Sequence, residues 1–238
     1  MIDPGRSIYN YNKNDKEKKL GYYVTKKNLA EKTDEWLEKI SPFNTHELKP
    51  DVENSCLMVI DMQNFFLDPD SPTFVPGGLA VKHNIKKFID AFRAAGRPVI
   101  YTRHAHHGNK IDAGIMEWWW EGMCIEGSPE SEVIDELKPL SGEKQIIKHR
   151  YSSFYNTDLE TVLRVQGIKD IVITGIMTNM CCESTARGAY YRDYRVFFPA
   201  DATGSVTEEM HLASLLNLGF GFAYICRTDE ILSHYIRK

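Results

Sequence analysis

The sequence predicts an α/β protein with three layers (α-β-α), in which helices cover both faces of a six-stranded parallel sheet. From Ser55 to the C-terminus, short apolar runs rich in β-branched residues alternate with segments of helical periodicity. This alternation is typical of parallel strands that are joined by crossover helices. The chain has 238 residues, of which 42% are hydrophobic, so one domain of this kind can bury a sizeable core.

Each predicted strand is a run of apolar residues bounded by polar or turn-forming residues. The run at Ile171 shows the pattern best, because three β-branched residues in succession suit a strand that is packed on both faces. The six predicted strands are Cys56–Ile60, Pro98–Thr102, Gln145–Ile147, Ile171–Thr174, Arg195–Phe198 and Phe222–Cys226.

The predicted helices lie between these strands. In Leu79–Ala95, apolar residues stand at positions 81, 85, 88, 89 and 92, which is a helical period, and Gly96 is placed to cap the end. Thr157 is the expected N-cap of a helix that runs to about Val165. The other predicted helices are Glu130–Leu137, Cys182–Tyr191, Glu208–Leu218 and Asp229–Tyr235.

The first 50 residues differ in composition from the rest of the chain. Met1–Lys19 is rich in Asn, Asp, Lys and Tyr and holds too few apolar residues to order itself alone. Residues 28–40 predict a short amphipathic helix that carries Trp36. We therefore expect residues 1–50 to form a partly extended N-terminal arm that packs on the body or on a neighbouring subunit, and residues 51–238 to form the folded domain. A fully disordered tail is the alternative.

The charge of the chain excludes several classes of partner. With 29 basic and 33 acidic side chains, the net charge of −4 offers no footprint for nucleic acid or an anionic membrane. The apolar runs are too short to span a bilayer, and residues 1–25 contain no signal-peptide core, so we expect a soluble, cytoplasmic protein. The five cysteines have no metal-binding spacing and are expected to be free thiols.

Three predicted strands end at reactive side chains. Asp61 follows the first strand, Lys148 follows the third and Cys181 follows the fourth. Because the carboxyl ends of parallel strands share one edge of the sheet, these groups are expected to meet there and to support nucleophilic acyl chemistry. Taken singly, the aspartate is more typical of a helix cap or turn and the lysine of a solvated loop. Their common position at matching strand ends favours a site.

The two adjacent cysteines have different expected roles. Cys181 stands where a helix is predicted to begin, and the helix dipole with its unpaired N–H groups predicts a lowered thiol pKa there. Positions 182, 186 and 189 are Cys, Ala and Ala, a small apolar stripe that suits packing on the sheet. We therefore interpret Cys181 as the candidate nucleophile and Cys182 as structural. The alternative is that both are core thiols.

Three segments resemble the motif blocks of isochorismatase-like cysteine hydrolases. They are DMQNFF at 61–66, KHRYSSFYNTDLE at 148–160 and TGIMTNMCCESTARGA at 174–189. The resemblance covers the chain from about residue 55 to the C-terminus and implies the Rossmann-like hydrolase fold of that family. It implies that Cys181 is the nucleophile, Asp61 the general acid/base and Lys148 the third catalytic residue. It also implies a cis peptide between Ile176 and Met177, with the backbone N–H groups of Met177 and Cys181 as the oxyanion hole.

Within that family, the motifs are most similar to those of ureide and N-carbamoyl amidohydrolases, such as ureidoacrylate amidohydrolase, biuret hydrolase and N-carbamoylsarcosine amidohydrolase. The implied function is a cysteine-dependent C–N hydrolase that cleaves a small amide, ureide or N-carbamoyl substrate through a thioester and releases ammonia or an amine. The resemblance implies no cofactor, and it implies a homodimer or homotetramer. Two alternatives stay open: a metal-dependent, nicotinamidase-like amidase with His104 and His106 as ligands, and a non-catalytic thiol sensor or scaffold.

The substrate pocket is expected to draw on residues near these motifs and on the stretch after the second strand. Three consecutive tryptophans at 118–120 cannot all face a core, so at least one should line a pocket or an interface. Arg150 is suited to hold a substrate carboxylate. We expect no metal site, and the predicted substrate-binding residues are Gln63, Phe66, His104, Trp118, Trp119, Arg150, Tyr151 and Thr178.

Overall fold

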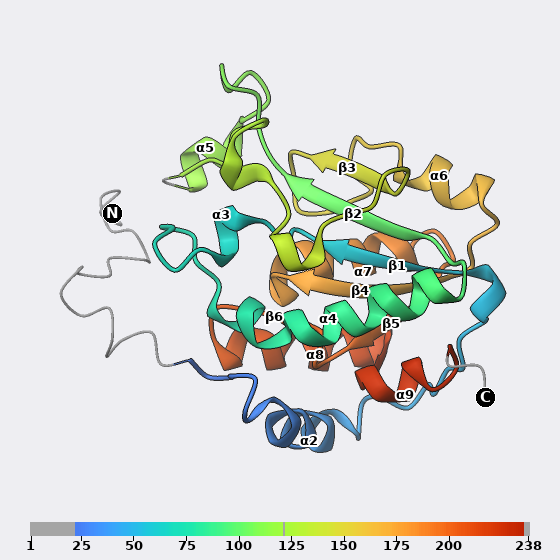
Figure 1. Cartoon of the computed structure of the whole chain (residues 1–238). Coiled ribbons are helices and arrows are strands. Elements are labelled where there is room, and N and C mark those ends of the chain that lie inside the picture. The colour runs from blue at the N-terminus through green and yellow to red at the C-terminus, as the bar shows by residue number, and fades with distance from the viewer. Residues whose placement is uncertain (1–21, 121, 236–238) are drawn as a thin grey trace.

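The computed structural model describes residues 22–120 and 122–235, and it confirms an α/β fold built on one parallel sheet (Figure 1). The strands are β1 (Ser55–Ile60), β2 (Val99–His104), β3 (Lys144–Lys148), β4 (Asp170–Ile176), β5 (Arg195–Pro199), β6 (Thr203–Gly204) and β7 (Tyr224–Cys226). Six of them lie across the sheet in the order β3-β2-β1-β4-β5-β7, and every pairing is parallel. The two residues of β6 pair with the end of β4.

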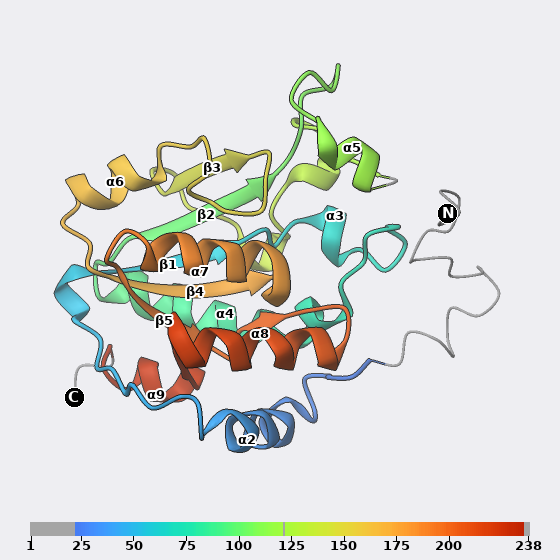
Figure 2. The same cartoon turned by 180° about the vertical axis from the view of Figure 1, so that it is seen from behind.

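Helices cover both faces of this sheet. Figure 1 shows α4 and α9 in front of the strands, and the reverse view in Figure 2 shows α7 and α8 in front of them. The central strands β1 and β4 are buried along their whole length, as expected for strands packed on both faces. Within residues 22–120 and 122–235, no helix is both long enough and apolar enough to cross a membrane. The helices are α2 (Leu29–Ile40), α3 (Asn64–Leu67), α4 (Pro76–Ala94), α5 (Ile115–Trp119), α6 (Leu159–Val165), α7 (Glu183–Tyr190), α8 (Glu208–Gly221) and α9 (Thr228–Leu232), with 3₁₀ turns at Val52–Asn54, Pro129–Ser131 and Asp135–Leu137.

The helix predicted at Glu130–Leu137 is wrong, because only its two ends form short 3₁₀ turns. The backbone between these turns is extended and pairs with the segment that follows β1. Val133 forms an antiparallel bridge with Gln63, and the N–H of Ile134 donates to the carbonyl of Met62 at 2.9 Å. These pairings use the backbone groups that a continuous helix would need for itself.

Two smaller differences concern the start of α6 and a short additional strand. Asp158, not Thr157, precedes the first residue of α6, and the Thr157 hydroxyl donates to the carbonyl of Ser153 at 2.5 Å. The strand β6 was not predicted, since two residues give no periodic signal.

Residues 22–50 lie against the body of the protein. The helix expected at residues 28–40 is present as α2, which packs beside α8 at the end of the molecule opposite α5 (Figures 1 and 2). Trp36 of α2 is 1% exposed, and its ring centroid lies 4.4 Å from that of His211 in α8. Further along, the Asn44 side chain exchanges two hydrogen bonds of 2.7 and 3.0 Å with the backbone of Ile225 in β7. Met1–Lys19 lies outside the described residues.

The burial of His211 makes the stability of the fold depend on pH. Burial lowers the pKa of this ring from 6.5 to about 3, so the native state keeps it neutral. The unfolded chain takes up a proton below pH 6.5, so acid favours unfolding. We expect the free energy of unfolding to fall between pH 6.5 and pH 3, with this ring contributing up to about 1.4 kcal/mol per pH unit. Urea unfolding at stepped pH should show a shallower slope for His211→Gln; an equal slope would contradict the assignment.

Candidate active site

The ends of three strands bring Asp61, Lys148 and Cys181 together at one edge of the sheet. Asp61 follows β1, Lys148 is the last residue of β3, and Cys181 lies beyond the end of β4. The chain runs from β1 toward β2 and β3 on one side, and from β4 toward β5 and β7 on the other. The strand order therefore reverses between β1 and β4, and the carboxyl end of such a reversal is where open α/β sheets bind ligands.

Lys148 links the other two side chains. Its Nζ lies 2.7 Å from Asp61 Oδ2 and donates a hydrogen bond to Cys181 Sγ at 3.2 Å. The second carboxylate oxygen, Asp61 Oδ1, accepts a hydrogen bond from Thr102 Oγ1 at 2.6 Å. The aspartate and lysine side chains are at most 1% exposed, whereas Cys181 retains 7%. An acid, a cation and a thiol thus form one contact group, and the thiol is the member that solvent reaches most.

The predicted lowering of the Cys181 pKa is wrong. Burial raises the pKa of this thiol to about 12, and the neighbouring Lys148 only partly opposes the effect. For Lys148 itself, burial disfavours the charged form, but Asp61 and Cys181 outweigh it and raise the pKa. The site therefore holds a protonated thiol beside a charged lysine, and the thiol has to lose its proton as it attacks.

Cys181 lies in a tight turn, Thr178–Cys182, that has π-helical hydrogen bonding and joins β4 to α7; we call it the cysteine turn. The N–H of Cys182 donates to the carbonyl of Met177 at 3.1 Å, which ties the two ends of the turn together. The peptide between Ile176 and Met177 is cis, as the resemblance implied. Gly175 precedes it with φ of 115°, and a Cβ there would come within 2.1 Å of the Ile60 carbonyl oxygen, so this close approach of β4 to β1 requires glycine.

A cavity of about 270 Å³ opens onto the thiol, which is a volume suited to a small molecule. Its polar lining includes Asp61, His104, His106 and Glu117, whereas most of its wall is aromatic or apolar. Among the described residues that line it, none is a lysine or an arginine. The aromatic residues of the wall are Phe65, Phe66, Phe74, Trp118, Trp119, Trp120 and Tyr151.

Five of the eight predicted substrate-binding residues line this cavity: Phe66, His104, Trp118, Trp119 and Tyr151. Trp118 and Trp119 are also largely open to solvent, with 76% and 57% exposure, so they stand at its mouth.

The other three predicted residues do not line the cavity, and each makes hydrogen bonds within the protein. The Gln63 amide is buried and exchanges hydrogen bonds with the His104 backbone, donating at 3.1 Å and accepting at 2.7 Å. Arg150 donates to the carbonyls of Asp112 and His149, at 3.0 and 2.6 Å. The Thr178 hydroxyl lies 2.8 Å from Nδ1 of His211.

Sequence reasoning missed Phe65, Phe74 and Trp120 as lining residues. Phe65 belongs to the first motif and Trp120 to the tryptophan run, so the predicted lining residues beside them in the sequence indicated this part of the wall. Trp120 Nε1 donates to the hydroxyl of Tyr151 at 3.0 Å, which joins two parts of the wall. Phe74 stands in a loop, and nothing in its sequence context marks it.

Comparison with known proteins agrees with the fold. A family model described as the isochorismatase domain matches residues 55–230. The chain belongs to the isochorismatase family. It is 38% identical to Nicotinamidase 3 of Arabidopsis thaliana over 192 residues, which cover 79% of this chain and 92% of that protein. It is 32% identical to a ureidoacrylate amidohydrolase of Caulobacter segnis over 212 residues, which cover 79% and 89%.

The structural relatives of this isochorismatase-family protein include a cysteine hydrolase from Pseudomonas syringae pv. phaseolicola. The two structures superpose with a TM-score of 0.76 at 30% sequence identity, over 79% of this chain and 95% of the other. The family resemblance of the three motifs is thereby confirmed. The roles of individual site residues stay predictions.

Two histidines extend the site of this isochorismatase-family protein away from the thiol. Nε2 of His104 lies 3.1 Å from Nε2 of His106, and Nδ1 of His106 lies 3.1 Å from Asp112 Oδ1. Burial lowers the pKa of both rings, so both are neutral. Since the carboxylate can only accept, His106 carries its proton on Nδ1 and His104 donates from Nε2. Nδ1 of His104 is therefore a free acceptor; it is buried and has no partner among the described residues.

A metal ion held by His104 and His106 does not fit this arrangement. Among the described residues, no third donor forms one cluster with both rings. A ring nitrogen of His104 does lie within 4.8 Å of donor atoms of Asp61 and Cys181. Two members of that cluster, Asp61 and Cys181, contact the ammonium of Lys148, whose charge would repel a metal cation.

In a second cluster, His106, Asp112 and His149, Nδ1 of both histidines is already engaged within the protein. Nδ1 of His149 lies 2.7 Å from the carbonyl oxygen of Ala105, so this nitrogen carries a proton and cannot coordinate.

Proposed function

We propose that the protein is a cysteine-dependent amidohydrolase that cleaves the C–N bond of a small, uncharged amide through a thioester intermediate. One observation carries this proposal: the Lys148 ammonium touches both the Asp61 carboxylate and the Cys181 thiol, and these two partners line an apolar cavity. The names of two relatives, a nicotinamidase and a ureidoacrylate amidohydrolase, support amide chemistry at such a site.

The reaction follows from the positions of these groups. Sγ of Cys181 attacks the amide carbonyl carbon while Asp61 accepts the thiol proton. Asp61 then gives this proton to the nitrogen, the C–N bond breaks, ammonia or an amine leaves, and a thioester remains. Asp61 next takes a proton from water, and the resulting hydroxide adds to the thioester carbon. The thiolate leaves, regains its proton from Asp61, and a carboxylic acid is released.

The surroundings stabilise the charges that develop. The buried ammonium of Lys148 favours the thiolate as its proton leaves, since the 3.2 Å contact is stronger in a medium of low dielectric constant. The backbone N–H groups of Met177 and Cys181 are proposed to bind the oxyanion, because the closed cysteine turn holds them beside the thiol. Nδ1 of His104 is proposed to accept the N–H of the scissile amide.

The lining of the cavity supports an uncharged acyl group. Arg150, the residue expected to hold a carboxylate, does not line the cavity and donates from Nη1 to two backbone carbonyls, and the Lys148 ammonium is paired with Asp61. A substrate carboxylate would lie among aromatic rings, and none of the described residues that line the cavity is a lysine or an arginine that could pair with it. Nicotinamide is a neutral aromatic amide, whereas ureidoacrylate carries a carboxylate, so the pocket agrees better with the first substrate type.

Benzamide and 4-carboxybenzamide form a matched pair for testing this substrate class. We expect kcat/KM for benzamide to exceed that for the carboxylated compound by about 100-fold or more, because the unpaired carboxylate has to be desolvated. Ammonia release measures both rates, and the methyl ester of the second compound controls for size. Faster turnover of the carboxylated amide would overturn the substrate class, and hydrolysis of ureides alone would overturn the acyl preference.

A further inference from the structure

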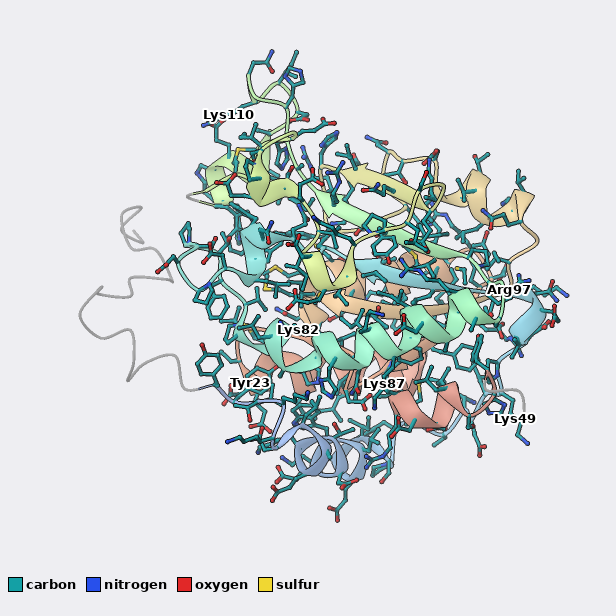
Figure 3. The ribbon with its side chains drawn as sticks, viewed as in Figure 1. Tyr23, Lys49, Lys82, Lys87, Arg97 and Lys110 are labelled. Carbon is teal, nitrogen blue, oxygen red and sulfur yellow. The ribbon has the colours of Figure 1, made fainter. Side chains whose placement is uncertain are left out.

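The segment that precedes the family domain reaches the cysteine turn indirectly. Two of its side chains each contact one residue, and that residue in turn contacts the cysteine turn. The family match begins at residue 55, so α2 and its flanking residues lie outside it. Two aromatic residues of this segment, Tyr23 and Trp36, pack against the region that follows β5. Figure 3 shows Tyr23 where the segment passes the beginning of α4.

Tyr23 reaches the turn through Ser205. The Tyr23 hydroxyl accepts a hydrogen bond from the N–H of Ser205 at 3.0 Å. The Ser205 hydroxyl in turn donates to Asn179 Oδ1 at 2.5 Å. Ser205 directly follows β6, which pairs with the end of β4, so this link meets the sheet where the cysteine turn begins.

Trp36 reaches the turn through His211. Its ring covers the ring of His211 at 4.4 Å, and its Nε1 donates to Glu208 at 2.9 Å. Nδ1 of His211 lies 2.8 Å from the hydroxyl of Thr178, and both of these residues are fully buried. The link is therefore shielded from water.

The two links end on adjacent residues, Thr178 and Asn179, which open the turn that carries Cys181. A shift of this turn would move Sγ relative to Lys148 and Asp61 and would move the backbone N–H groups beside the thiol. Displacements of about 1 Å at a reacting group cost on the order of 100-fold in rate. We propose that Tyr23 and Trp36 are positioning residues for the nucleophile, acting through Ser205 and His211 on the cysteine turn.

The test compares variants that remove these two links with a variant that removes other contacts of the same segment. The double variant Tyr23→Phe/Trp36→Leu removes both links, whereas Asn44→Ala removes two hydrogen bonds between the segment and β7, away from the turn. We expect kcat for amide hydrolysis to fall about 10- to 100-fold in the double variant, with KM changed less than about threefold. Asn44→Ala should lower the melting temperature but leave kcat unchanged.

A second readout does not need the proposed function. The rate at which iodoacetamide alkylates Cys181, followed by mass spectrometry, reports the contact of the thiol with Lys148 and Asp61. This rate should fall in the double variant and not in Asn44→Ala. If wild-type protein hydrolyses no amide, the proposed function fails, yet the alkylation rates still test the positioning.

Variants at His211 distinguish an effect on the position of the nucleophile from an effect on folding. His211→Phe fills the space without bonding Thr178, whereas His211→Asn places an amide near the position of Nδ1. We expect the first to lose activity and alkylation rate and the second to restore much of both. Equal rates in all variants, after matching for melting temperature, would show that the segment only stabilises the fold and would overturn the proposal.

Discussion

Replacing Cys181 with Ala is expected to lower kcat/KM for amide hydrolysis by about 10⁴-fold or more, because the group that forms the thioester is lost. The melting temperature should stay close to that of the wild type, since the thiol keeps 7% exposure and lies next to the cavity. Ammonia release and thermal unfolding measure the two effects. Cys181→Ser should be nearly as inactive, because an alcohol gives up its proton less readily than a thiol.

The neighbouring Cys182 provides the matched control. It is fully buried, and burial raises its pKa well above the ordinary thiol value. Cys182→Ala should therefore cost about 1 kcal/mol of stability and leave turnover within about threefold of wild type. Full activity in Cys181→Ala together with inactivity in Cys182→Ala would reverse the assignment. A thiol sensor is disfavoured on the same ground, because an oxidant cannot reach Cys182 in this fold.

The sheet could be predicted because its signal is local. The residue types in runs such as Ile171–Thr174 indicate strands that are buried on both faces. The helices between these runs indicate that the strands are parallel. The segment Glu130–Leu137 could not be predicted, because its conformation depends on pairing with residues near Met62, about 70 positions earlier. Such pairing produces no hydrophobic periodicity in the sequence of either segment.

The position of the site could be predicted, but its electrostatics could not. The carboxyl ends of the parallel strands place Asp61, Lys148 and Cys181 at one edge of the sheet, and this does not depend on the conformation of the loops. The direction of the Arg150 side chain depends on a loop that offers it two carbonyls. The pKa of Cys181 depends on burial, which is a property of the folded protein as a whole and outweighs the opposing effect of Lys148.

The buried pair of Asp61 and Lys148 gives the second large expected effect, and here stability and activity should separate. Asp61→Asn leaves an unpaired ammonium, and Lys148→Met leaves an unpaired carboxylate, at positions that are at most 1% exposed. Each single variant should lose about 3–5 kcal/mol of unfolding free energy, as is usual when one partner of a buried ion pair is removed. Urea unfolding at pH 7 measures this loss.

The double variant Asp61→Asn/Lys148→Met decides whether the pair is catalytic or only structural. Because both charges are removed, most of the lost stability should return. Turnover should not return, since Asp61 moves the proton between thiol, leaving nitrogen and water, and Lys148 stabilises the thiolate. We expect ammonia release at least about 10³-fold below wild type in all three variants. A double variant that regained both stability and activity would show that the pair only holds the fold together, and the proton route through Asp61 would have to be abandoned.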